Sequence, residues 1–164
     1  MTIQPIVFVI RNYHHESPLP GHVVFYVKEL KRSLVFYRDL LGFEQVGEMK
    51  HPFNACALTS GRTHHEILLI EVGAAPPPQK GHRLGLYHIG IKIGDSLDEL
   101  RTARDELNEA GVSISGMSDH TVSQSLYLED PDGNEVELYV DDPNVDWEKD
   151  PAAVVAAIKP LRLM

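Results

Sequence analysis

Two histidines and one glutamate occupy comparable positions in three β-type runs of this chain. His22 lies in GHVVFYVK, His88 lies in LYHIGIKI, and Glu137 lies in the closing run NEVELYV. Two imidazoles and one carboxylate on rigid strands form a facial triad, which leaves positions on Fe(II) open for a substrate and dioxygen. We therefore interpret these three residues as candidate metal ligands.

Strand alternation places the three candidates on the face opposite to branched apolar residues, because successive side chains of a strand point to opposite faces. In each run the apolar set is expected to pack on a helix: Val23, Phe25 and Val27; Ile89, Ile91 and Ile93; Val136, Leu138 and Val140. Both histidines and Glu137 then remain on the face that points toward a shared cavity.

Another candidate group lies in the segment GRTHHEILLI, where His64, His65 and Glu66 precede an apolar run typical of a buried strand. Most histidines are exposed or are hydrogen-bonded core residues, so a role for His65 depends on its neighbours in the fold. The remaining histidines lie in loop-like sequence and are interpreted as surface residues: His14, His15, His51 and His82.

The elements that carry these residues occur in the same order twice. The first series comprises a strand at 21–28, an amphipathic helix at 29–41 that Gly42 ends, and strands at 43–49, 54–59 and 65–71. The second comprises a strand at 86–93, a helix between Ser96 and Gly111, and strands near 112–115, 125–129 and 135–140. Ser96 and Glu99 have the spacing of a capping box.

This internal repeat of about 60 residues predicts an α+β fold of two βαβββ modules. Each module is too small to bury both faces of its sheet, so we expect two paired curved sheets in an incomplete barrel around a central cavity. One domain is expected, with module one at about 21–72, a proline-rich linker at 73–83, module two at about 84–141 and an extension at 142–164. An alanine-rich stretch of the extension predicts a C-terminal helix that ends at about Ile158.

Charge and cysteine content exclude several classes of function. The chain has 164 residues, a net charge of -9 and a single cysteine. It can therefore form neither an internal disulfide nor a cysteine-cluster zinc site, so nitrogen and oxygen must bind any metal. The negative charge disfavours nucleic acid as a partner. No apolar run approaches the roughly 20 residues that cross a bilayer, and residues 1–10 lack signal-peptide features, so we expect a cytoplasmic protein without membrane partners.

Three segments carry a resemblance to a known superfamily: HVVFYVKELKRSLVFYRDLLGF, LYHIGIKI and LYLEDPDGNEVELYVD. Together they resemble the vicinal oxygen chelate (glyoxalase/bleomycin resistance/dioxygenase) superfamily, over a stretch from about Gly21 to Asp142. Within it, SDHTVSQSLYLEDPDGNEVELY is most similar to the type I extradiol dioxygenases, which cleave catechols.

For the metal centre, the resemblance implies that His22, His88 and Glu137 bind Fe(II), with Mn(II) as the alternative. The implied reaction is extradiol cleavage of a catechol-type aromatic diol with dioxygen. The implied partners are therefore this diol and dioxygen, and exposed sheet edges also favour a homo-oligomer.

The resemblance implies catalytic roles for three further residues. His65 matches a histidine that faces the dioxygen site and takes part in acid–base chemistry. His120 matches a histidine beside the substrate hydroxyls, and Tyr127 matches a tyrosine that hydrogen-bonds the substrate. Such a reaction needs imidazoles that exchange protons near neutral pH.

Two other functions remain open on the same fold. A glyoxalase-like lyase or isomerase would use Zn, Ni or Co with a fourth ligand, a carboxylate that Glu66 could supply. A small-molecule binding protein of the bleomycin-resistance kind would use the cavity without a metal, and would not need His22, His88 and Glu137.

Overall fold

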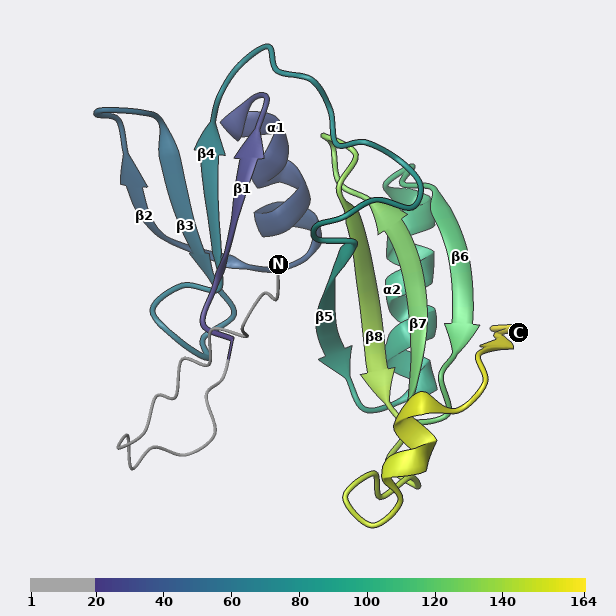
Figure 1. Cartoon of the computed structure of the whole chain (residues 1–164). Helices are drawn as coiled ribbons and strands as arrows, with labels where there is room; N and C mark the ends of the chain where they lie inside the picture. Colours follow the sequence, from purple (N-terminus) through teal and green to yellow (C-terminus); the bar gives the residue numbers. More distant parts are fainter. Residues whose placement is uncertain (1–19) are drawn as a thin grey trace, which may run out of the picture.

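The computed structural model describes residues 20–164 of the chain. Two separate sheets, each with a helix on one face, form the body of the protein (Figure 1). The predictions for residues 1–10, His14 and His15 lie outside the described residues. Across residues 20–164, no helix is long and apolar enough to cross a membrane.

The first module consists of β1 (Val23–Val27), α1 (Leu30–Leu34) continuing as the π-helical η1 (Val35–Leu40), β2 (Glu44–Met49), β3 (Ala55–Thr59) and β4 (Ile67–Glu71). Its sheet has the order β1-β4-β3-β2, with β1 and β4 parallel and the other pairs antiparallel. Gly42 ends the helical segment, as predicted, with a φ of 80° that side chains disfavour.

The second module repeats this order with β5 (His88–Gly94), α2 (Leu97–Glu109), β6 (Ile114–Asp119), β7 (Ser123–Glu129) and β8 (Glu135–Asp141). With the C-terminal strand β9 (Lys159–Pro160), its sheet has the order β5-β8-β7-β6-β9, and β5 and β8 are parallel. The predicted capping box is present, because the Ser96 side chain accepts from Glu99 N and donates to Glu99 Oε2. The predicted α+β class and the βαβββ repeat are confirmed.

The C-terminal extension differs from the helix that we expected to end at about Ile158. A five-residue 3-10 helix, η2 (Pro151–Val155), is followed by the short strand β9 (Lys159–Pro160). Ala153 is the one buried residue of η2, and Val155 is 82% exposed, so no apolar face stabilises a longer helix. β9 pairs with β6 and extends the second sheet.

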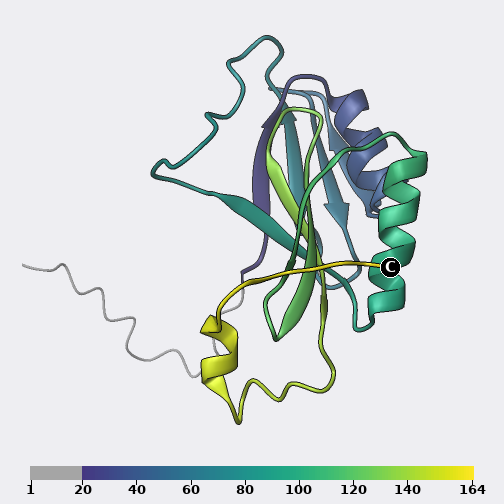
Figure 2. The same ribbon diagram turned by 90° about the vertical axis from the view of Figure 1, so that its right-hand side faces the viewer.

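The strand faces agree with the predicted alternation. In β1, Phe25 and Val27 are buried whereas Tyr26 is 71% exposed. In β8, the aliphatic residues at alternate positions are buried, and Glu135 and Glu137 between them stay partly accessible. The helices α1 and α2 lie together on one side of the molecule (Figure 2), and both modules contribute to one hydrophobic core. The candidate site residues of β5 and β8 therefore lie on the open face of their sheet.

A buried hydrogen bond joins the two modules. Tyr37 of η1 is fully buried, and its hydroxyl donates to Oδ2 of Asp130 over 2.9 Å. Burial and then the charge of Asp130 raise the pKa of Tyr37, so the hydroxyl remains a donor. Beside it, Asp132 accepts from Lys28 N and pairs with Arg32. The turn before β8 is thereby fixed to the first module.

Candidate active site

His88 and Glu137 meet on the open face of β5 and β8. The register of these parallel strands pairs His88 with Glu135 and Gly90 with Glu137. Nε2 of His88 lies 3.1 Å from Oε2 of Glu137. Two atoms in neighbouring octahedral positions are about 3 Å apart when each is about 2.1 Å from a first-row metal ion. The separation therefore fits the binding of one ion by both side chains.

Gly90 leaves space beside the Glu137 carboxylate. A Cβ on Gly90 would lie 3.5 Å from Glu137 Oε2 and 3.5 Å from Cε1 of Tyr139. The φ of Gly90 lies outside the positive region, so its backbone conformation does not require glycine. A larger side chain would instead lie over the carboxylate, so the glycine leaves room for an ion or a ligand.

Tyr127 and His120 extend this pair into a hydrogen-bonded chain. The Tyr127 hydroxyl donates to Oε1 of Glu137 over 2.9 Å, and Nε2 of His120 lies 2.7 Å from the same hydroxyl. A hydroxyl has one proton, so the Tyr127 oxygen must accept from Nε2–H of His120. Burial, followed by the hydrogen bond to Glu137, raises the pKa of Tyr127. Tyr127 therefore remains a protonated donor near neutral pH.

The tip of the β6–β7 hairpin positions His120. His120 N donates to Ser123 O over 2.8 Å, and Thr121 has a φ of 72°. A β-branched residue rarely adopts a positive φ, and such strain is typical of functional sites. Asp119 stabilises the turn by accepting from Thr121 N. The sequence alone did not indicate this strained position.

The histidines of the first module form a separate cluster. The rings of His22 and His65 are stacked, with centroids 4.6 Å apart, and Nδ1 of His64 lies 2.6 Å from Nδ1 of His65. Burial, followed by the positive charges that His64 and His22 can carry, lowers the pKa of His65. His22 and His65 both lie in loop residues that precede their strands, so strand alternation does not govern their directions.

The six predicted site residues thus fall into two clusters. The first module brings His22 next to His65, and the second brings together the remaining four: His88, His120, Tyr127 and Glu137. In the described part of the chain, no group of three or more His, Cys, Asp or Glu residues is arranged to hold a metal ion. Two of the three expected ligands are therefore in contact, and His22 lies in the other cluster.

The carboxylate of Glu66 is already hydrogen-bonded within its own loop. Its two oxygens accept from Ser60 N and Thr63 N, over 2.8 and 2.9 Å. Burial raises the pKa of Glu66, but hydrogen bonds from Ser60, Thr59 and Thr63 outweigh it and the pKa lies below its usual value. A metal ion would have to replace these bonds. Glu66 is therefore used to order the loop before β4.

The strand registers identify the first-module counterpart of Glu137. Val24 pairs with Leu68 in β1 and β4, as Gly90 pairs with Glu137 in β5 and β8. Since His22 and His88 lie two residues before Val24 and Gly90, Leu68 is the counterpart of Glu137. The first module therefore has an aliphatic residue where the second has its carboxylate.

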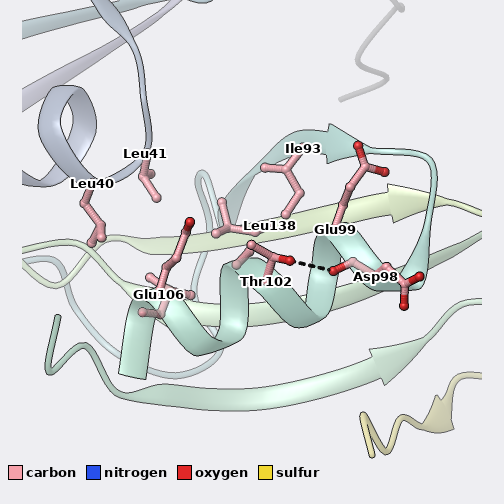
Figure 3. Close-up of a pocket in the computed structure, with 10 residues that line it drawn as sticks. Leu40, Leu41, Ile93, Asp98, Glu99, Thr102, Glu106 and Leu138 are labelled. Atoms are coloured by element: carbon pink, nitrogen blue, oxygen red, sulfur yellow. Dashed lines mark hydrogen bonds between the residues drawn. The ribbon is translucent and has the colours of Figure 1, made fainter. Parts of the chain in front are cut away.

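The hollow between the helices lies apart from this cluster. It has a volume of about 420 Å³ and combines aliphatic and acidic residues, including Leu40, Leu41, Ile93, Leu138, Asp98, Glu99 and Glu106 (Figure 3). None of the six predicted site residues is among the described residues that line it.

Comparisons with known proteins agree with this fold. Residues 19–138 match the family described as the Glyoxalase/Bleomycin resistance protein/Dioxygenase superfamily. The chain belongs to this superfamily, as the sequence motifs predicted. The domain from Frankia sp. EAN1pec described as glyoxylase/bleomycin resistance protein/dioxygenase has a TM-score of 0.65 and 17% identity, over 82% of this chain and 99% of that one. That likeness concerns the fold alone.

Two curated relatives are named as dioxygenases. The chain is 36% identical to catechol-2,3-dioxygenase of Bacillus subtilis over 136 residues, which are 83% of this chain and 46% of the relative. It is 33% identical to biphenyl-2,3-diol 1,2-dioxygenase 3 of Rhodococcus globerulus, over 76% of this chain and 64% of the relative. The chain thus spans about half to two thirds of the length of these relatives.

Proposed function

We propose that the protein cleaves a catechol-type aromatic diol with dioxygen, beside the diol, with non-haem Fe(II) or Mn(II) as cofactor. The observation that carries the proposal is the contact of His88 with Glu137, combined with Leu68 at the matching position of the first module. A metal ion with one carboxylate and two histidines as ligands would keep coordination positions open for substrate and dioxygen. The two dioxygenases among the relatives support the same reaction class.

In this proposal His22, His88 and Glu137 would hold the metal ion, which would supply Lewis-acid and redox chemistry for the diol and dioxygen. The residues of the chain orient the substrate and transfer protons. In the structure the O–H of Tyr127 is directed to Glu137 and the N–H of His120 to Tyr127, and a substrate oxygen bound beside Glu137 would receive these hydrogen bonds instead. These donors stabilise negative charge on that oxygen.

His65 is the proposed proton acceptor. Its lowered pKa keeps the imidazole neutral near pH 7, so the ring can take a proton from a substrate hydroxyl. Its ring stacks on that of His22, a proposed ligand, and this contact supports the role. The first module thus supplies the base, and the second supplies the donors.

A glyoxalase-like lyase is the second candidate. Such a site adds a carboxylate from the first module, but Leu68 occupies the position that matches Glu137, and Glu66 is hydrogen-bonded to its own loop. These observations favour the three-ligand site. A metal-free binding protein does not account for the convergence of His88 and Glu137 beside Gly90.

The test is ring cleavage by reconstituted protein. Protein loaded anaerobically with Fe(II) is mixed with catechol and then with air, while dioxygen uptake and the yellow ring-opened product are followed. We expect product with wild type and with His82→Ala, which removes an exposed histidine, and none with His88→Ala. Lack of uptake with every simple catechol, together with tight Zn or Ni binding that requires Glu66, would move the assignment to the lyase.

The expected homo-oligomer forms part of the proposal. All six residues of the edge strand β2 are exposed, including Val46 and Met49 at 52% and 40%. An edge of this kind can be covered by another copy of the chain. Light scattering coupled to gel filtration tests this, and a mass equal to one chain would count against it.

A further inference from the structure

Glu135 lies beside the His88 ring nitrogen that does not face Glu137. Its Oε1 is 3.4 Å from Nδ1 of His88, and the register places the two residues opposite each other. Both atoms are buried, and neither has a hydrogen-bond partner among residues 20–164. Buried polar atoms without partners are costly, and a small approach to about 3.2 Å would give both atoms a partner at once.

Tyr87 lies next to the His88 ring. Its ring centroid is 4.7 Å from that of His88, at an interplanar angle of 52°.

The first module shows that a glutamate at the position of Glu135 need not interact with a histidine. Its counterpart, Glu66, accepts from backbone N–H groups of the preceding loop. In the second module the turn before β8 directs two backbone N–H groups to Asp130 instead. Glu135 is therefore left to interact with His88.

We propose that Glu135 is a positioning residue that holds the His88 proton on Nδ1 and keeps Nε2 free for a metal ion. A carboxylate that accepts from one ring nitrogen fixes the orientation and tautomer of a histidine and makes its other nitrogen a better ligand. Nε2 then directs its lone pair toward the side where Glu137 lies. The benefit for metal binding rests on the proposed function, whereas the tautomer does not.

The first experiment measures the tautomer in metal-free protein. Ring ¹⁵N chemical shifts of His88 are recorded in the Glu137→Ala background, which removes the competing carboxylate, and are assigned by comparison with His88→Ala. We expect the proton on Nδ1. Adding Glu135→Ala should return it to Nε2, whereas adding Glu135→Gln should keep it on Nδ1, because the amide oxygen still accepts. A proton on Nε2 with Glu135 present would overturn the proposal.

The second experiment measures the affinity for Zn²⁺, used alone as a diamagnetic probe, by competition with a chelator. Glu135→Ala should weaken binding about 10–100-fold, and Glu135→Gln should stay within about threefold of wild type. The control is Glu129→Ala, which removes another carboxylate of the second module, one that pairs with Lys80. It should leave the affinity unchanged.

The two measurements separate the positioning role from the proposed function. Equal Zn²⁺ affinity of Glu135→Ala and wild type would overturn the positioning role. The His88 proton could depend on Glu135 as expected while the wild-type protein binds neither Zn²⁺ nor Fe(II). That result would support the contact between Glu135 and His88 and refute the metal centre.

Discussion

The β1–β4 and β5–β8 pairs have the same topology and different chemistry on their open faces. In the first pair Val24 lies opposite Leu68, and in the second Gly90 lies opposite Glu137. The core face of both pairs carries apolar residues that pack in the hydrophobic core, but the fold places no such demand on the open face. A repeated fold can therefore carry a site whose two halves have different roles.

The same contrast holds for the glutamates that precede these positions. Glu66 orders the loop before β4, whereas Glu135 lies next to His88. Two glutamates at matching positions of the two modules thus have different functions. The reason is that the turns before them direct their backbone N–H groups to different acceptors. The predictions below test these contrasts.

The largest effect is expected when the second module is made to resemble the first. Glu137→Leu copies Leu68 and removes the one proposed carboxylate ligand together with the acceptor of Tyr127. We expect iron binding to be lost and ring-cleaving activity to fall at least about 1,000-fold. Iron content and dioxygen uptake measure this, with Glu129→Gln as the control. Activity near wild type would remove Glu137 from the metal centre.

A smaller loss of activity is expected for His120→Gln. The change removes an imidazole that donates to Tyr127 but leaves the proposed ligands in place. We expect kcat to fall about 100-fold, as for the loss of an acid–base group, with unchanged iron content. Single-turnover kinetics on iron-loaded protein measure it. A parallel loss of iron would instead place His120 among the ligands.

The contact between the modules is tested by Tyr37→Phe. Asp130 loses one buried donor but keeps bonds from Asp132 and Asn134, so we expect a loss of about 1–2 kcal/mol in the free energy of unfolding. Denaturant titration measures this loss. Tyr26→Phe removes the hydroxyl of a tyrosine that is 71% exposed and should change stability little. Equal effects of the two variants would show that the hydrogen bond between Tyr37 and Asp130 contributes nothing specific to stability.

The smallest effect is expected for Glu66→Gln, and it should depend on pH. The pKa of Glu66 is lowered in the folded state, so its ionised form stabilises the protein above the ordinary glutamate pKa of 4.5. This stability is lost as the pH falls through the lower, folded-state pKa. We therefore expect the variant to be about 1 kcal/mol less stable at pH 7, and the difference to shrink below about pH 4.5. Denaturant titrations at several pH values measure it, and a difference independent of pH would contradict the role of the charge.

Much of the fold follows from local patterns in the sequence. Alternation predicted that Phe25 lies on the core face of its strand, where it is buried, and the capping box predicted the start of α2. The repeat predicted two βαβββ modules. These features depend on residues near one another in the chain, where side-chain direction and hydrogen bonding are set by local geometry.

The ends of the elements were less predictable. β6 begins at Ile114 and extends to Asp119, beyond the predicted 112–115, because pairing with β7 and β9 continues it. The predicted C-terminal helix is reduced to the short η2 because Val154 and Val155 are exposed and do not pack in the core. Such lengths depend on partners that are distant in the sequence.

The sequence by itself determined the residue types of the site and the faces of β5 and β8 on which His88 and Glu137 lie. Only the tertiary structure decided their partners. It placed Tyr127 and His120 in one chain with Glu137, His22 against His65, and left Glu135 beside His88. The physical reason is that alternation fixes the side of a strand on which a side chain lies, whereas its hydrogen-bond partners depend on how distant strands and turns pack.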